Sequence, residues 1–169
     1  MSKKQIELSK LSAMKRNKMS QPMNWLIKNH MIFKQDSILD YGCGQADDIR
    51  FMKELGYDID GFDINWKNYT PTKHQYDVVT CLYVLNIVDP EDRQDLLKKI
   101  YKLLAYNGMA YFAVRGDINE VTETSRGWVQ YPVRISEDFI VKKTTSMILY
   151  SVPLFKYRDS LIGAKNEQI

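Results

Sequence analysis

The sequence predicts an α/β protein, a three-layer α/β/α sandwich built on a mainly parallel sheet. Short apolar runs of the kind that form buried strands alternate along the chain with segments in which apolar residues recur at helical spacing. The first such run, 38–41, leads into Gly42-Cys43-Gly44 and then into a helical pattern over 46–55. Because glycines at such a turn let the backbone approach a ligand closely, this turn is the first candidate binding site.

The chain is long enough for one domain with a substantial apolar core, since 44% of its 169 residues are hydrophobic. Its net charge of +3 favours nucleic acid only weakly as a partner. The two cysteines, Cys43 and Cys81, are too few and too interior for a disulfide framework, which indicates a reducing compartment. No apolar run approaches the ~20 residues of a membrane span and no signal-peptide pattern opens the chain, so we expect a cytoplasmic protein with no membrane contact. His30 and His74 have no neighbouring cysteine or second histidine, so no metal site is expected.

Residues 1–36 are expected to form an N-terminal helical arm. Residues 1–18 carry six basic side chains, and apolar residues recur there at a loose helical spacing. This segment is either a solvated, partly frayed helix or an arm that contacts phosphate groups or covers a substrate. Ser20 resembles a helix N-cap with Pro22 close behind, and the helix that they begin is predicted to run through Asn29.

A second predicted strand, 57–62, ends in Asp63, about twenty residues beyond the glycine turn. In nucleotide-binding α/β folds an acid at this place accepts hydrogen bonds from ribose hydroxyls. Asp47 and Asp48 open the helix after the turn, where they complement the helix dipole but would repel a phosphate. A ligand with a ribose, a positive charge and no phosphate fits this pattern, and S-adenosylmethionine (SAM) is the common one.

The glycine turn and Asp63 together resemble motif I and the acidic second-strand end of class I SAM-dependent methyltransferases, over about residues 37–114. The resemblance implies a compact Rossmann-like SAM-dependent methyltransferase fold for residues 37–155, with 156–169 as a polar C-terminal tail. It also implies that SAM is the cofactor. The residues at the positions where the family binds the cofactor are Asp40, Gly42, Cys43, Gly44, Asp63, Ile64, Cys81 and Leu82.

The connection after Asp63 is too short for the family's usual third strand and its helix. Only thirteen residues, 64–76, separate Asp63 from Asp77. A helical crossover alone takes at least about ten to twelve residues, and a strand adds about five. We therefore expect the fold to lack that strand, its helix and the acid that normally contacts the adenine amine. The local substitutes that could cover an adenine ring are Ile64, Asn65 and Trp66, and core packing is an equally good interpretation of the tryptophan.

The strongest strand pattern in the chain runs over 76–88. Asp89-Pro90 then begins a helix with an acidic cap and a proline in its first turn. Asn107-Gly108 is predicted to end this helix before a strand over 109–115, in agreement with the family pattern.

The polar segment 116–130 leaves the end of that strand at the edge where open α/β sheets bind ligands. A loop of this length in a compact domain is usually functional, so we expect a substrate lid. A short helix over 136–140 and a final antiparallel strand over 146–152 complete the predicted fold.

In methyl transfer the sulfonium cofactor supplies the electrophile. The protein therefore mainly aligns the nucleophile with the methyl group and the sulfur, and removes a proton where needed. The resemblance places Tyr83 and Asn86 near the reacting methyl group, where Tyr83 would orient or deprotonate an acceptor and Asn86 would hydrogen-bond to it. The alternatives are packing of Tyr83 on the methionine moiety and a turn-capping role for Asn86. Arg115, with Arg126 and Trp128 of the lid, would hold an anionic or aromatic substrate, unless these side chains form a surface ion pair or a hydrophobic plug.

The sequence contains no motif that names the methyl acceptor. It has neither the Asn/Asp-Pro-Pro-Tyr/Phe signature of base-amine methylation nor a Pro-Cys nucleophile, and Cys81 fits a core or cofactor-lining position. The segments Leu39-Asp-Tyr-Gly-Cys-Gly44, Tyr83-Val-Leu-Asn86 and 125–130 resemble a group of small bacterial and phage-type methyltransferase-like proteins. Some related sequences accompany DNA-modification systems, so nucleic acid is a candidate partner through the basic arm.

The expected function is therefore SAM-dependent methyl transfer to an unassigned acceptor. Two alternatives remain open at this point. One is a SAM-binding protein that transfers nothing, either a regulatory partner or an enzyme that cleaves SAM. The other is a nucleic-acid-binding module.

Overall fold

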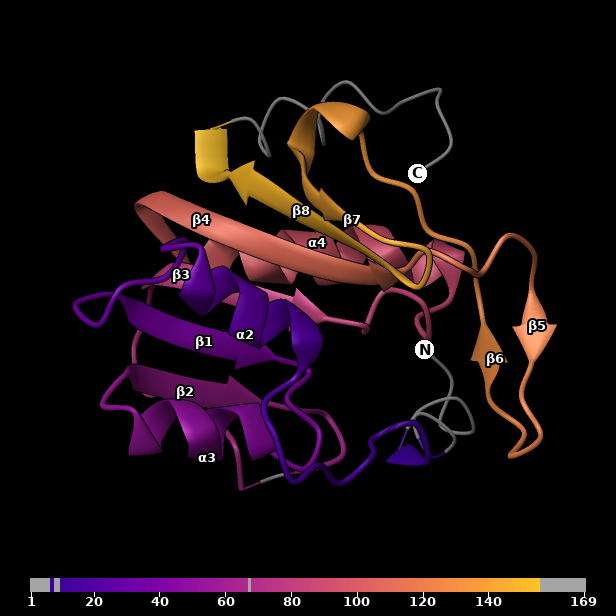
Figure 1. Ribbon diagram of the computed structural model, residues 1–169, viewed down its shortest axis with the longest axis horizontal. Helices are drawn as coiled ribbons and strands as arrows, with labels where there is room; N and C mark the ends of the chain where they lie inside the picture. Colours follow the sequence, from indigo (N-terminus) through magenta and orange to yellow (C-terminus); the bar gives the residue numbers. More distant parts are fainter. Residues whose placement is uncertain (1–6, 8–9, 67, 156–169) are drawn as a thin grey trace.

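A computed structural model describes residues 7, 10–66 and 68–155. Its main sheet has six strands in the order β2-β1-β3-β4-β8-β7 (Figure 1). Neighbouring strands among β2, β1, β3 and β4 pair in parallel, and β8 and β7 are added antiparallel. The strands are β1 (Ser37–Tyr41), β2 (Asp58–Phe62), β3 (Tyr76–Leu82), β4 (Leu104–Arg115), β7 (Ile140–Lys143) and β8 (Met147–Pro153), and the α-helices are α2 (Gln21–Lys28), α3 (Asp47–Glu54) and α4 (Pro90–Leu103).

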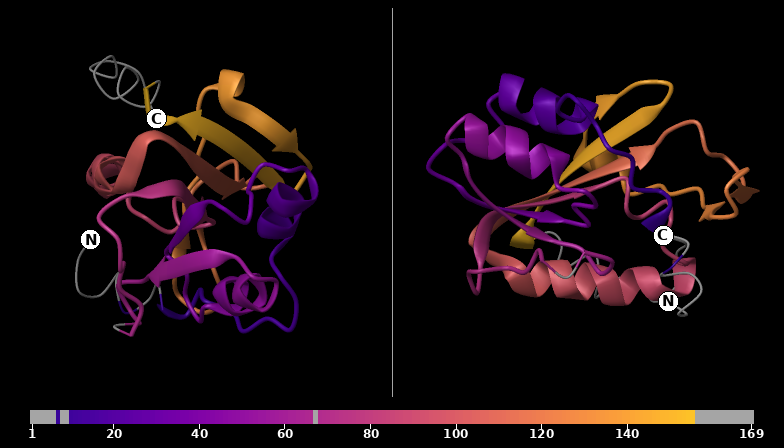
Figure 2. Two further views of the ribbon diagram at one scale, coloured as in Figure 1. Left: turned by 90° about the vertical axis from the view of Figure 1, so that its left-hand side faces the viewer. Right: turned by 90° about the horizontal axis from the view of Figure 1, so that it is seen from below.

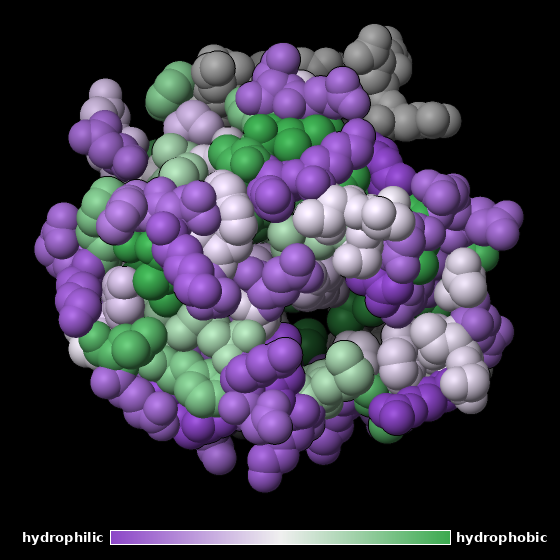
Figure 3. Space-filling view, viewed as in Figure 1, coloured by the Kyte–Doolittle hydropathy of each residue, from purple (hydrophilic) through white to green (hydrophobic). Residues whose placement is uncertain are grey.

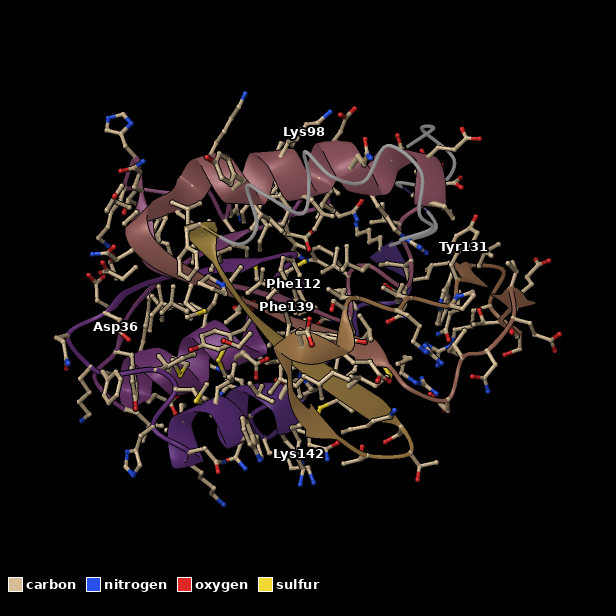
Figure 4. All side chains as sticks on the ribbon, turned by 90° about the horizontal axis from the view of Figure 1, so that it is seen from above. Asp36, Lys98, Phe112, Tyr131, Phe139 and Lys142 are labelled. Carbon is tan, nitrogen blue, oxygen red and sulfur yellow. The ribbon has the colours of Figure 1, made fainter. Side chains whose placement is uncertain are left out.

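The helices cover both faces of the sheet, α2 and α3 on one side and α4 on the other (Figure 2). Because successive side chains of a strand point to opposite faces, neighbouring residues of β1 enter different cores. Ile38 packs with the α2 and α3 side chains, whereas Leu39 packs with the α4 side chains and with Phe112, which lies under Phe139 (Figure 4). The predicted three-layer α/β/α class is confirmed.

The helix predicted after Ser20 is confirmed as α2. The Ser20 hydroxyl accepts a hydrogen bond from the backbone N–H of Met23 at 3.3 Å, and Pro22 occupies the first turn. Met23 and Leu26 are fully buried against the sheet. In the basic lead-in, residues 1–6 and 8–9 lie outside the described part of the chain. The helix predicted there does not extend over 11–18, which is turn, bend and irregular chain.

The short connection after β2 contains neither the family's usual third strand nor its helix, as predicted. Residues 63–66 and 68–75 form no helix or strand, so β2 is the edge of the sheet and the chain passes directly to β3. The connection folds back along β2 instead. The Thr72 N–H and hydroxyl and the Tyr76 hydroxyl all donate to one carboxylate oxygen of Asp60, and Lys73 pairs with Asp58 at 2.9 Å. Polar side chains therefore cover an edge that would otherwise be open to pairing.

Two predicted boundaries in the second half of the chain are wrong. β3 ends at Leu82 rather than at 88, because Tyr83 takes a positive φ of 62° that no strand residue adopts. The helix predicted to end at 107–108 ends at Leu103, and β4 begins at once. β4 reaches its regular register with β3 only after a bulge, because Tyr76 pairs with Leu104 but Val78 pairs with Met109.

The expected lid contains a two-stranded hairpin, β5 (Thr122–Glu123) with β6 (Val129–Gln130), which stands away from the main sheet (Figure 1). The short helix predicted at 136–140 is the 3₁₀ turn η1 (Glu137–Phe139), capped by Ser136, and the final antiparallel strand is confirmed as β8. The strand β7 was not predicted, since Val141-Lys142-Lys143 lacks the alternation of a half-buried strand. The tail predicted at 156–169 lies outside the described residues.

Candidate active site

A cavity of about 970 Å³ lies at the carboxyl ends of β1, β2, β3 and β4, where open α/β sheets bind ligands. The molecular surface is hollowed at this edge of the sheet (Figure 3). Four parts of the chain line the cavity: the segment 12–16, the turn after β1, the loop after β2, and the ends of β3 and β4. One face of α4 and the hairpin strand β6 complete its wall. Of the residues expected in the site, Gly42, Cys43, Gly44, Asp63, Ile64, Leu82, Tyr83, Asn86 and Arg115 line it.

The turn after β1 and the acid after β2 form one hydrogen-bonded unit. The backbone N–H groups of Gly42 and Cys43 both donate to the carbonyl of Phe62, at 2.7 and 3.1 Å. The Gly44 N–H donates to one oxygen of the Asp63 carboxylate at 2.8 Å, and the Asn65 N–H donates to the other at 2.8 Å. Each carboxylate oxygen keeps a free lone pair after these bonds, because an ionised carboxylate accepts about four. Asp63 is therefore fixed in the cavity as an acceptor of further hydrogen bonds.

Gly42 is required by a protein contact as well as by its backbone angle. Its φ of 85° is one that side-chain-bearing residues rarely adopt, and a Cβ there would lie 2.3 Å from Cγ2 of Val84. The sequence pattern attributed this glycine to close approach of a ligand. The structure shows that the space over it is filled by the loop after β3, so Gly42 lets two loops of the cavity wall meet.

Asp40 and Cys81 are buried behind the cavity wall and do not line it. The Asp40 carboxyl accepts a hydrogen bond from the Thr80 hydroxyl at 2.8 Å. Burial raises the pKa of Asp40 to about 7, and the nearby Asp48 carboxylate adds to the shift. Burial also raises the pKa of the Cys81 and Cys43 thiols, so both remain protonated and neither is an activated nucleophile.

The raised pKa of Asp40 predicts a pH-dependent stability. Between pH 3.8 and about 7 the folded protein retains a proton that the unfolded chain releases, so this group's contribution to stability falls as pH rises through that window. Asp40→Asn, which keeps an acceptor for Thr80 but cannot ionise, is expected to be more stable than the wild type above pH 7, by up to about 4 kcal/mol. The two proteins should converge at the acidic end of the window in urea unfolding experiments. The assignment fails if both proteins show the same pH dependence.

Two carboxylates at the start of α3 hold the segment 12–16 over the glycine turn. Asp48 is 2% exposed and accepts hydrogen bonds from the Ser20 N–H at 2.6 Å and from Nη2 of Arg16 at 3.0 Å. Asp47 accepts from the Arg16 N–H at 2.6 Å and from Nη2 of Arg50 at 3.1 Å. We call Arg16, Ser20, Asp47 and Asp48 the clasp.

The clasp places part of the N-terminal segment directly on the binding turn. A Cβ built on Gly44 would lie 3.0 Å from Cβ of Ala13, and the Gln45 side chain donates to the Ala13 carbonyl at 2.8 Å. Residues Ser12, Ala13, Met14 and Arg16 line the cavity. Of the basic segment 1–18, for which a solvated helix and a covering arm were both predicted, the described residues 12–16 lie over the glycine turn. The sequence indicated Asp47 and Asp48 only as partners of the helix dipole. No local sequence pattern predicted that they would hold this segment.

Asn86 joins three parts of the cavity wall. Its side-chain oxygen accepts from the Arg115 N–H at 2.7 Å, and its side-chain nitrogen donates to the Tyr131 carbonyl at 2.9 Å. The Tyr131 N–H returns a bond to the Asn86 carbonyl at 2.7 Å. Tyr131 lies between the hairpin and α4 (Figure 4), and its ring is 5.7 Å from the Arg93 guanidinium. With both ends of its amide used, Asn86 is suited to fix the hairpin to the sheet rather than to bind an acceptor.

Tyr83 and Arg115 line the cavity from the ends of β3 and β4. Burial raises the pKa of the Tyr83 hydroxyl and the nearby Arg115 opposes the shift only in part, so the hydroxyl is suited to donate a hydrogen bond rather than to act as a base. Arg115 makes a bidentate ion pair with Asp117 at 2.7 and 2.6 Å. Of the two lid residues named from the sequence, Trp128 lines the cavity and Arg126 is exposed on the hairpin loop.

At the other end of the cavity, Ile64, Asn65 and Trp66 follow Asp63 along the wall. The ammonium of Lys10 lies 5.7 Å from the centre of the Trp66 ring. Among the described residues no group of three histidine, cysteine or acidic side chains could hold a metal ion. Within that same part of the chain, no helix has the length and apolar composition needed to cross a membrane.

Residues 8–136, more than half of the chain, match the protein-family model described as a methyltransferase domain. No curated protein matches the chain. Among solved structures it is similar to Burkholderia thailandensis 1,6-didemethyltoxoflavin-N1-methyltransferase with bound 1,6-didemethyltoxoflavin and S-adenosylhomocysteine (SAH), at 12% identity and a TM-score of 0.55 over 79% of this chain and 76% of that one.

Two further similar structures have the same fold. A SAM-dependent methyltransferase from Methanosarcina mazei matches at 14% identity and a TM-score of 0.54, over 74% of this chain and 96% of that one. A DhpI–SAH complex matches at 11% identity and a TM-score of 0.54, over 89% of this chain and 97% of that one.

Proposed function

This chain belongs to the methyltransferase-domain family and is a SAM-dependent methyltransferase. From that premise we propose that SAM binds in the cavity at the glycine turn and that the methyl acceptor binds at the ends of β3 and β4. The observation that carries the proposal is the Asp63 carboxylate, fixed by the Gly44 and Asn65 N–H groups inside the cavity. An acid held in this way, next to a glycine turn, suits the two hydroxyls of a ribose.

The charges around the turn favour SAM over a phosphorylated nucleotide. The first turn of α3 carries Asp47 and Asp48, and both are buried, so the helix N-terminus that would attract a phosphate is occupied by carboxylates. Asp63 adds a third carboxylate beside them. A ligand without phosphate groups and with a positive sulfonium is the one whose charge complements this end of the cavity.

Loop residues would replace the family's missing third strand in contacts with adenine. Ile64 and Trp66 line the cavity directly after Asp63, and Lys10 over the Trp66 ring holds that side chain at the cavity edge. We propose that these two side chains cover the purine. Leu82 and Cys43, which also line the cavity, would contact the rest of the cofactor as apolar surface.

When bound, SAM supplies the electrophilic methyl group. The protein's part is to hold the nucleophile in line and to exclude water. The Tyr83 hydroxyl, protonated at neutral pH, would donate a hydrogen bond that orients the acceptor. Asp40 and Cys81 would support the wall from behind, and Asn86 would keep the hairpin over the site. Calorimetric titration with SAM and SAH tests cofactor binding, and incubation with methyl-labelled SAM and cell extract tests transfer.

Asp63→Ala is expected to weaken SAM binding by about 1–3 kcal/mol, since the ribose hydroxyls lose their charged acceptor. Titration calorimetry of the variant with SAM and SAH measures the loss, and thermal unfolding checks that the fold is retained. The matched control is Asp58→Ala, which removes a carboxylate from the opposite end of β2, where it forms an exposed ion pair with Lys73. Wild-type affinity in Asp63→Ala would refute the assignment of the ribose site.

The basic lead-in supports a nucleic-acid partner only through charge, and eight of its eighteen residues lie outside the described part of the chain. Arg16, the cation of the lead-in that lines the cavity, is already paired with Asp48. We propose a cytoplasmic location, supported by Cys43 and Cys81, which are both free thiols and both buried. Fluorescence microscopy of a tagged protein would test it.

A further inference from the structure

Resting on the proposed function, we propose that the methyl acceptor is a small, flat aromatic molecule that binds between Tyr83 and the Trp128 side chain of the hairpin. The acceptor is then neither a nucleic acid nor a protein. Three features of the cavity support this inference: its covering, its charge and its aromatic wall.

The cavity is covered from two sides. On one side the clasp holds residues 12–16 against the glycine turn, with Asp48 almost fully buried. On the other side Asn86 bonds the base of the hairpin to the ends of β3 and β4 through both ends of its amide. A polymer chain would have to pass beneath one of these coverings to reach the reacting methyl group, whereas a small molecule needs only the opening seen in Figure 3.

The cavity has room for a second small molecule. Ligand pockets commonly measure roughly 300–1,000 Å³. At about 970 Å³ this cavity lies at the upper end of that range. A cofactor at the glycine turn would therefore leave the compartment between α4 and the hairpin for an acceptor of modest size.

The charges in the cavity oppose a nucleic acid. Binding of nucleic acid depends on cations that neutralise phosphates. Among the described residues, the cations that line the cavity are Arg16, Lys99 and Arg115, and two of them are neutralised, Arg16 by Asp48 at 3.0 Å and Arg115 by Asp117 at 2.6 Å. Four carboxylates, Asp47, Asp63, Asp92 and Asp95, also line the cavity. Asp47 and Asp95 are paired with Arg50 and Lys98, and the charge of Asp63 would repel a phosphate backbone.

The acceptor compartment presents aromatic and aliphatic surface. Trp128 of the hairpin and Tyr83 of the strand end both line it, together with Leu96 of α4 and Ile87. The indole nitrogen of Trp128 is buried without a hydrogen-bond partner among the described residues. A flat ring can stack on such a surface, and a saturated ring of the same size cannot match its shape or its quadrupole.

The test uses the full chain saturated with SAH and two neutral probes, 1-naphthol and its saturated counterpart decahydro-1-naphthol. Ligand-observed NMR titration is expected to show binding of 1-naphthol and roughly two- to tenfold weaker binding of the saturated alcohol. Trp128→Ala should weaken 1-naphthol binding by a similar factor and leave SAH affinity unchanged, and Trp128→Phe should restore it. Equal binding of the two alcohols, or an unaltered affinity in Trp128→Ala, would overturn the inference.

A second measurement separates small molecules from polymers. Extract from the cells that contain the protein is divided by ultrafiltration, and each fraction is incubated with the enzyme and methyl-labelled SAM. Label in the small-molecule filtrate, reduced in Trp128→Ala, supports the inference. Label in nucleic acid or protein, or in neither fraction, contradicts it. Failure of SAH to bind the wild type would instead overturn the cofactor assignment, so the two proposals fail in different ways.

Discussion

Gly42→Ala is expected to lower the free energy of unfolding by roughly 2–5 kcal/mol and to abolish SAM binding at concentrations that saturate the wild type. Two costs add at this position. An L-residue held at a φ of 85° costs about 1–2 kcal/mol, and the new methyl group, 2.3 Å from Cγ2 of Val84, adds an overpacking cost of about 1–3 kcal/mol. Urea unfolding followed by fluorescence and titration calorimetry with SAM measure the two effects.

Gly56→Ala is the matched control for the contact with Val84. Its φ of 83° imposes a comparable backbone strain, but the nearest atom to its Cβ would be Nζ of Lys34 at 3.8 Å, the end of a flexible side chain. We expect a loss of only about 1 kcal/mol and normal SAM binding. In a double-mutant cycle, Val84→Ala should recover part of the stability lost in Gly42→Ala. Equal losses in the two alanine variants would show that the contact between the loops has no energetic weight.

Asp48→Ala is expected to destabilise the fold by about 3 kcal/mol and to accelerate SAH dissociation roughly tenfold, which corresponds to about 1.4 kcal/mol. The reason is that Asp48 is 2% exposed and is the acceptor for both the Ser20 N–H and the Arg16 guanidinium. Hydrogen bonds to charged groups contribute about 1.5–3 kcal/mol each, and the Ser20 N–H would be left without its acceptor. Loss of these bonds also loosens residues 12–16, which cover the binding turn and keep their bonds to Asp47 and Gln45.

Two variants separate the parts of this effect. Asp95→Ala removes an exposed carboxylate whose ion pair with Lys98 spans 3.3 Å, so its effect on stability should be under about 1 kcal/mol. Arg16→Ala leaves the bond from the Ser20 N–H to Asp48 intact, and should accelerate SAH dissociation with a smaller loss of stability. Stopped-flow displacement of SAH and urea unfolding provide the two readouts. If Asp48→Ala lost stability but released SAH at the wild-type rate, the clasp would hold the fold together without controlling access to the site.

The structure confirms those predicted elements that depend on residues close together in the sequence. Ser20 caps α2 because its hydroxyl reaches an N–H three residues away. The absence of a third strand followed from the length of one connection, which is too short for a strand and a helix whatever its sequence. The boundary errors have non-local causes. β3 stops at Leu82 because Tyr83 takes a positive φ of 62°, and the loop that follows packs Val84 against the glycine turn after β1, a contact that no apolar pattern in 83–88 signals.

The candidate site likewise contains residues that could be predicted from the sequence and residues that could not. The glycine turn and Asp63 could be named from the sequence because their spacing along the chain sets their meeting at the sheet edge. Asp40 and Cys81 share that pattern but lie behind the wall, since the alternation of side chains along β1 and β3 turns them from the cavity. The sequence did not indicate the hydrogen-bond partners of Asp48 and Asn86. Each of these side chains could bond to several polar groups, and no sequence pattern distinguishes among them.

The sequence by itself determined the α/β class, the order of the main elements, the absence of the third strand and the acid after β2 that lines the cavity. These depend on periodicity, caps and connection lengths, which act over a few residues. Only the tertiary structure decided that Asp48 holds the Ser20 N–H, 28 residues away, and that Asn86 holds Tyr131, 45 residues away. Such bonds form when packing brings distant segments into contact and excludes water, so the covering of the site is a property of the folded core rather than of any stretch of the chain.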